Sequence, residues 1–219
     1  MSEPARRLHP IDAPGTDERA WAAWPWLSTL PGRGLAGLAS VTSAVVVAAH
    51  PDDEVLGAGG LMAVLAAARA RLRLVAVTDG ERSHRGHASP AGQRAGHPGG
   101  GADGCARSAG RGFRSVCLAP WEHDLHPDHE AAGRAARRAA AGPVYRYPVW
   151  MWHWAFPADP RVPWDQALRV PLPSRAASRK RAAIRCFASQ VQDRGHGLGP
   201  VLSPSMIAHF TRPMEVLFR

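Results

Sequence analysis

The stretch SAVVVAAHPDDEVLGAGG, residues 43–60, decides the fold that this chain is expected to adopt. Its opening run of small and β-branched residues is typical of a strand that is covered on both faces. The residues from Glu54 onward have the pattern of a helix, and LRLVAVTDG at 72–80 follows as a second strand. Strand, helix and strand in this order form a βαβ unit, whose right-handed crossover makes the two strands parallel.

The rest of the chain supplies more elements of both kinds. Further strands are predicted at SVCLAPW (115–121), PVYRYPVWMW (143–152) and MEVLF (214–218). Helices are predicted at 16–30, with a break near Pro25, at 129–141 and at 174–190. We therefore expect a single α/β domain over residues 1–219, with an N-terminal extension and helix over 1–40. Its architecture would be three-layer and Rossmann-like, a mostly parallel sheet with helices on both faces.

Composition and charge narrow the class of protein. The chain has 219 residues and a formal net charge of +9, but its arginines are scattered among alanines and glycines and are not interleaved with stacking aromatics. This pattern argues against nucleic-acid binding. The three cysteines show no CxxC spacing, which argues against a disulfide framework or a cysteine zinc site. No apolar run reaches membrane-spanning length and the N-terminus lacks a signal-like core, so a cytoplasmic protein without membrane contact is expected.

The middle of the chain departs from this pattern. From Thr78 to Ser115 there is no Val, Ile, Leu or Met, and Phe113 is the only large apolar residue. Such a segment cannot bury a core, and long structureless loops are uncommon in compact domains. We expect residues 83–115 to be disordered, and their Gly, Ala, Arg, Pro, His and Ser content suggests an out-of-frame or deleted stretch, with a shortened natural variant as the alternative.

Two short motifs combine histidines and carboxylates where strands should end. His50 and Asp53 are three residues apart at the start of a helix, so both side chains can address one point, while Asp52 points elsewhere. HPDHE at 126–130 also follows a strand and opens a helix, so both motifs can meet at one edge of a parallel sheet. Alternatively, these acids only cap helices or complement their dipoles. A catalytic zinc needs about three such ligands and an open position, and spacing leaves open which histidine of the second motif binds it.

The two motifs together resemble the PIG-L or LmbE-like family of zinc-dependent N-acetylglucosaminyl deacetylases. The resemblance rests on VVVAAHPDDEVLGAGG (45–60) and HPDH (126–129), and continues in LAPWEHDLHPDHEAAGRAA, YPVWMWHWA and KRAAIRCFASQ. It implies a metal-dependent amidase that removes an acetyl group from an N-acetylated sugar-containing small molecule, with Zn²⁺ or another divalent metal as cofactor. By the same resemblance, the metal ligands are His50, Asp53 and His129. Asp52 is then the general base, His126, in its protonated form, stabilises the oxyanion and Asp128 orients His126.

Substrate recognition leaves more than one interpretation. Trp150, Trp152 and Trp154 alternate along the predicted strand, where they would form either a sugar-stacking wall or ordinary core. Lys180 and the arginines around it would either meet an anionic group or lie on a solvated helix face. Two alternative functions also stay open. One is a metal-dependent phosphoesterase, and the other is an inactive family remnant whose middle segment is disrupted.

Overall fold

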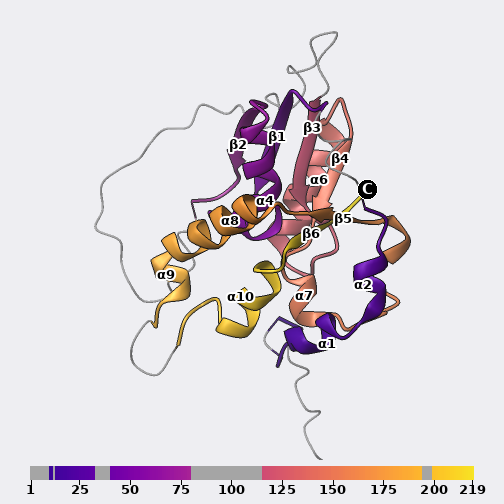
Figure 1. The fold of residues 1–219 in the computed structure, drawn as a ribbon, viewed down its shortest axis with the longest axis vertical. Helices are drawn as coiled ribbons and strands as arrows, with labels where there is room; N and C mark the ends of the chain where they lie inside the picture. Colours follow the sequence, from indigo (N-terminus) through magenta and orange to yellow (C-terminus); the bar gives the residue numbers. More distant parts are fainter. Residues whose placement is uncertain (1–9, 12, 33–39, 80–114, 194–198) are drawn as a thin grey trace, which may run out of the picture.

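The computed structural model describes residues 10–11, 13–32, 40–79, 115–193 and 199–219. Its centre is a six-stranded sheet with the strand order β2-β1-β3-β4-β6-β5 (Figure 1). The strands are β1 (Ser43–Ala48), β2 (Arg71–Ala76), β3 (Ser115–Pro120), β4 (Val144–Tyr147), β5 (Ala167–Pro171) and β6 (Met214–Phe218).

The strand pairing confirms the predicted fold class. β1 pairs in parallel with β2 and with β3, and β3 pairs in parallel with β4. β6 is antiparallel to both β4 and β5, which places an antiparallel ribbon at one end of the parallel sheet. β5 was not predicted, because ALRVP at 167–171 is short and contains an arginine and a proline.

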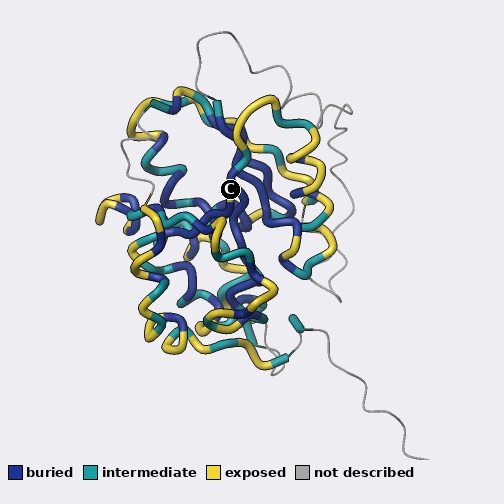
Figure 2. The backbone as a smooth tube through the Cα atoms, turned by 90° about the vertical axis from the view of Figure 1, so that its right-hand side faces the viewer, coloured by how far each residue is buried: buried dark blue, intermediate teal, exposed yellow. Residues whose placement is uncertain are grey.

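Helices cover both faces of the parallel part of the sheet. α4 (Asp53–Ala67) buries Leu56, Leu61 and Leu65 in the larger core, against the face of β1 that carries Val46. α6 (Pro127–Ala139) buries Ala132 and Ala136 against the opposite face. β1 and β3, between these two layers, are almost completely buried, whereas β2 at the edge of the sheet is largely exposed (Figure 2). The three-layer arrangement is therefore a consequence of strands that are apolar on both sides.

The remaining helices are shorter, except for α8, and lie around this centre. They are α1 (Glu18–Ala22), α2 (Pro25–Thr29), α7 (Met151–Trp154), α8 (Ser174–Cys186), α9 (Ala188–Val191) and α10 (Pro204–Phe210), with a 3₁₀ turn at Trp164–Gln166. The predicted opening helix is indeed divided before Pro25, and Asp17 caps its first part by accepting from the backbone N–H of Arg19. No helix among the described residues is long and apolar enough to cross a membrane.

The tryptophans at 150–154 are not arranged as predicted. Residues 151–154 form α7 instead of continuing a strand, so the three rings do not share one face. Trp152 packs edge-on against the buried Trp21, whereas Trp154 stacks near Trp121. The Pro148 that follows β4 ends strand pairing there, because proline has no N–H to donate. A sugar-stacking wall of alternating tryptophans is therefore ruled out.

Lys180 also differs from both of its predicted roles. It is only 3% exposed, and its Nζ lies 2.7 Å from Glu215 Oε1 on β6. Glu215 also accepts hydrogen bonds from the backbone N–H groups of Gly60 and Leu61 in the middle of α4. The buried ion pair thus joins α8, α4 and the sheet, and Lys180 is neither on a solvated face nor available to a ligand.

Two sequence predictions about organisation are not decided by this fold. The segment predicted to be disordered, apart from Ser115 at the start of β3, lies outside the described residues. The single-domain assignment over residues 1–219 stays a prediction.

Gly133 allows α6 to approach the end of β3, and its substitution should be costly. A Cβ at this position would lie 2.4 Å from the backbone oxygen of Pro120, which cannot move away as a side chain could. We expect Gly133→Ala to lower the free energy of unfolding by about 1–3 kcal/mol in urea titrations. Gly59→Ala is the matched control, because its Cβ would meet only side-chain atoms at 3.4 Å and the change should stabilise α4 by about 0.5–1 kcal/mol. Equal effects at both positions would contradict this role of Gly133.

Candidate metal centre

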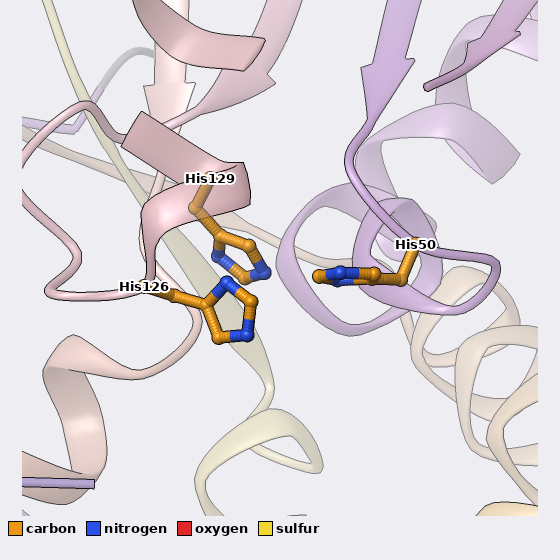
Figure 3. Close-up of side chains that lie close together, drawn as sticks. All are labelled: His50, His126 and His129. Atoms are coloured by element: carbon orange, nitrogen blue, oxygen red, sulfur yellow. The ribbon is translucent and has the colours of Figure 1, made fainter. Parts of the chain in front are cut away.

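The two histidine motifs meet at the carboxyl ends of neighbouring parallel strands. His50 follows β1 just before α4, while His126 and His129 lie at the start of α6, which follows β3. The three imidazole rings converge on one point from two sides (Figure 3). One ring nitrogen from each lies within 4.8 Å of the others, a grouping that could hold a metal ion. The predicted meeting of the two motifs at one edge of the sheet is therefore observed.

Asp53 places a carboxylate oxygen between two of these histidines. Its Oδ2 lies 3.2 Å from His50 Nδ1 and 3.2 Å from His129 Nε2. The same oxygen accepts a hydrogen bond of 2.7 Å from the backbone N–H of His50, which fixes the carboxylate at the start of α4. The structure thus brings together all three residues predicted as metal ligands, with His126 as a fourth neighbour. Which of these side chains would hold a metal stays a prediction.

His129 is held in place by a residue that sequence reasoning missed. Its Nδ1 lies 2.7 Å from Asp124 Oδ2, and both side chains are fully buried. The Asp124 carboxylate also accepts backbone N–H groups from Val149, Trp150 and Met151. A carboxylate five residues before a candidate ligand was the only available signal, and it does not by itself indicate a contact. Asp124 fixes the ring so that Nε2 is directed away from it, as partners of metal-binding histidines do.

The charges of this site favour a cation. Burial alone would lower the pKa of His129, but the charge of Asp53 and the hydrogen bond with Asp124 raise it to about 10. Burial likewise opposes ionisation of Asp53, yet the positive charge of His129 holds its pKa well below the usual range. His129 Nε2 is buried and makes no hydrogen bond. A buried nitrogen without a hydrogen-bond partner, beside an ionised carboxylate and two further imidazoles, fits a divalent metal ion with nitrogen and oxygen ligands.

Asp52 has the backbone and the electrostatics of a functional residue. It is the residue before α4, its φ is 139°, and its side chain is nearly buried. Non-glycine residues in this region are strained and are concentrated at active sites. Burial, together with the charges of Asp53 and Glu54, raises the pKa of Asp52 to about 7. A carboxylate with this pKa is suited to take up and release a proton near neutral pH.

His126 is the N-cap of α6 and is neutral at neutral pH. Its Nδ1 accepts a hydrogen bond of 3.3 Å from the backbone N–H of Asp128, so the neutral ring carries its proton on Nε2. Burial and the positive charges of the neighbouring histidines lower its pKa to about 4. The sequence prediction used a protonated His126, whereas here the neutral ring offers a single N–H.

Asp128 contacts a different histidine from the one predicted. Its Oδ2 lies 2.9 Å from His50 Nε2, and the half-exposed carboxylate makes this contact from the mouth of the site. Its contact with His126 is only through the backbone N–H. The proline at 127 begins the helix and places Asp128 in its first turn. Asp128 is therefore placed to orient His50, while Asp124 orients His129.

Comparison with known proteins is consistent with the motifs. Residues 45–99 match the family model PIG-L, described as GlcNAc-PI de-N-acetylase, so the predicted resemblance to this family is confirmed over that segment. No curated protein matches the chain. Among solved structures, the conserved protein TT1542 from Thermus thermophilus is similar at 25% identity and a TM-score of 0.46, over 68% of this chain and 79% of that one.

Removal of the charge at Asp124 should weaken metal binding without removing a candidate ligand. Asp124→Asn keeps the shape of the side chain but loses the carboxylate that fixes His129. We expect zinc affinity, measured by competition with a colorimetric chelator, to fall ~10–100-fold. Glu130→Gln on the same helix is the control. The Glu130 carboxylate pairs with the half-exposed Arg134, so this change should leave the zinc affinity within about twofold of the wild type. Unchanged zinc affinity in Asp124→Asn would refute the orienting role.

Proposed function

We propose that this chain, which resembles the PIG-L family across its first histidine motif, is a metal-dependent hydrolase that removes an N-acetyl group from an N-acetylglucosamine-type substrate. The observation that carries the proposal is the convergence of His50, His126 and His129 around Asp53 at the ends of two parallel strands. The description of the matching family model, GlcNAc-PI de-N-acetylase, supports the reaction and the class of substrate.

We assign His50, Asp53 and His129 as the residues that would hold the metal, with Zn²⁺ as the expected ion. The burial of Asp53 and His129, the partial burial of His50 and the ionised state of Asp53 support this assignment. When bound, such an ion polarises an acyl carbonyl and lowers the pKa of water from about 15.7 towards about 7. Asp124 and Asp128, each within 2.9 Å of a ligand histidine, fix the two rings from opposite sides.

Asp52 is the proposed general base. Its place beside Asp53 in the sequence and its raised pKa suit it to accept the proton of the attacking water. The same carboxyl group can then deliver this proton to the departing amine, so that acetate and a free amine result. Because an amide is cleaved, both transfers have to occur for the sugar amine to leave as a neutral group.

His126 is the proposed partner of the carbonyl oxygen. The N–H on its Nε2 can donate to the negative charge that develops on this oxygen during attack. A neutral imidazole is sufficient for this role, because the donor needs only to be fixed before the reaction. Its Nδ1 contact at the N-terminus of α6 and its stacking against Trp150, at 6.4 Å between ring centroids, hold it in this orientation.

Asp52→Asn should separate catalysis from metal binding. The variant keeps the proposed ligands but removes the base, so acetate release from a panel of N-acetylglucosaminyl substrates should fall by roughly 10²–10⁴-fold. Zinc content of the purified variant should stay at about one ion per chain, as in the wild type. Glu130→Gln serves as the control and should retain full turnover, because its side chain lies outside the site.

The same assay distinguishes the alternatives. Phosphate release from a phosphorylated sugar added to the panel, without acetate release, would identify a phosphoesterase. Absence of zinc and of turnover in the wild-type protein would identify an inactive remnant. Full acetate release by Asp52→Asn would show that another group acts as the base.

A further inference from the structure

A second pocket lies on the other side of the loop that leads into the HPDH motif. It has a volume of about 750 Å³. It is bounded by that loop, by α6, by β4 and by the segment that follows α7. Its lining includes Trp121, Glu122, Arg137, Arg146, Trp154 and Arg161. No candidate metal ligand lines it. The pocket is therefore distinct from the metal centre, although the same loop contributes to both.

Two buried polar atoms of the pocket lining have no partner within the described chain. Trp121 is 1% exposed, and its Nε1–H donates to no acceptor. Glu122 is 4% exposed, and its Oε2 accepts from no donor, although Oε1 accepts from Arg137 and Arg146. Burial opposes its ionisation, but a backbone hydrogen bond and the charge of Arg146 hold the pKa of Glu122 below its usual value. Unpaired buried groups of this kind cost free energy, and they are commonly satisfied by a ligand or water.

Two exposed arginine side chains lie at the entrance of the pocket. The guanidinium groups of Arg137 and Arg161 are about half exposed, at 55% and 54%. Arg161 lies over the Trp154 ring, 4.6 Å from its centroid, and Asp159 fixes it there through hydrogen bonds to both carboxylate oxygens. Arg146, in the floor, is neutralised by Glu122 and bonded to Gln166. The side chains that line the pocket include four arginines, Arg137, Arg146, Arg161 and Arg219, and one carboxylate, Glu122. Arginines thus outnumber acidic side chains in the lining, and planar guanidinium groups suit phosphate or carboxylate.

We propose that this pocket is a binding site for a small anionic, hydroxyl-rich molecule such as a sugar monophosphate. A hydroxyl group is both donor and acceptor, so the hydroxyls of such a molecule match both the unpaired acceptor Glu122 Oε2 and the unpaired donor Trp121 Nε1. The anionic group then lies at the entrance beside Arg137 and Arg161.

The site does not depend on the proposed deacetylation. Trp154 Nε1 donates to the backbone oxygen of Asp124, whose carboxylate holds His129 on the opposite side of the loop. The two sites thus share a wall but no lining side chain that would bind a ligand. Binding to the second pocket can be measured with or without metal, so failure of either proposal leaves the other unaffected.

Calorimetric titration with glucose 6-phosphate tests the proposal directly. The full chain should bind one molecule with a dissociation constant below about 1 mM, and the affinity should be equal in zinc-loaded and chelator-treated protein. Glucose and inorganic phosphate, tested separately, should each bind at least about tenfold more weakly, because each supplies only half of the contacts.

Two arginines of α6 provide a matched pair of variants. Arg137→Ala removes a cation at the pocket entrance and should weaken glucose 6-phosphate binding by roughly tenfold. Arg134→Ala removes the same charge from the same helix, outside the pocket, and should change the affinity by less than about twofold. Trp121→Phe, which removes the unpaired N–H, should weaken binding by several fold, with the melting temperature recorded to show that the variant is folded.

Three results would overturn the proposal. The first is no detectable binding of glucose 6-phosphate to the wild-type chain. The second is binding that requires zinc, which would place the phosphate at the metal centre. The third is equal weakening in Arg134→Ala and Arg137→Ala, which would show a general charge effect. Inorganic phosphate bound as tightly as glucose 6-phosphate would also exclude a role for Glu122 and Trp121.

Discussion

The buried carboxylate of Asp124 is the contact on which the rest of the site depends. It is fully buried, yet it is paired with His129 and with three consecutive backbone N–H groups at 149–151. These bonds connect the start of α6 to the segment that leaves β4, so two neighbouring parallel strands are locked together at their carboxyl ends. Burial of a carboxylate is unfavourable unless it is fully paired, so this network is stable only in one arrangement. The position of the His129 ring is therefore set by the same contacts that close this edge of the sheet.

The parts of this arrangement that the sequence could predict are those with a local periodic signal. The β-branched run of β1 and the helical pattern of α4 place His50 and Asp53 at a strand end, and parallel pairing with β3 brings the second motif beside them. Asp124 could not be predicted, because its partners lie 5 to 27 residues away and arise from tertiary packing. The strand predicted through the tryptophans at 150–154 was wrong although its local pattern was clear. Alternating large residues are typical of a strand, but Pro148 ends the pairing of β4 before the tryptophans begin. Lys180 was misjudged because its partner, Glu215, is 35 residues further along the chain.

Strain at two positions shows where the chain is bent to form the site. Asp52 and Leu125 both have positive φ values, 139° and 59°, and each lies immediately before or beside a residue of a histidine motif. Residues other than glycine adopt such backbone conformations only when surrounding contacts enforce them. For Asp52, the enforcing contacts are the first turns of α4, whose N–H groups at 55 and 56 donate to its backbone oxygen. The strain sets the carboxylate of Asp52 apart from that of the adjacent Asp53, so that two neighbouring acids have different environments and different pKa values.

The loop between β3 and α6 contributes side chains both to the candidate metal centre and to the second pocket. Asp124 contacts His129, and His126 lies in the candidate metal centre, whereas Trp121, Glu122 and Leu125 line the second pocket. Because Trp154 donates to the backbone oxygen of Asp124 and also lines the pocket, a ligand that moves this ring would act on the backbone of the residue whose carboxylate supports His129. Occupancy of the pocket would then be coupled to metal affinity, and by thermodynamic reciprocity metal binding would change the affinity of the pocket by the same factor. Equal pocket affinities with and without zinc correspond to a coupling factor near one, which is the expected result if the Asp124 network is rigid.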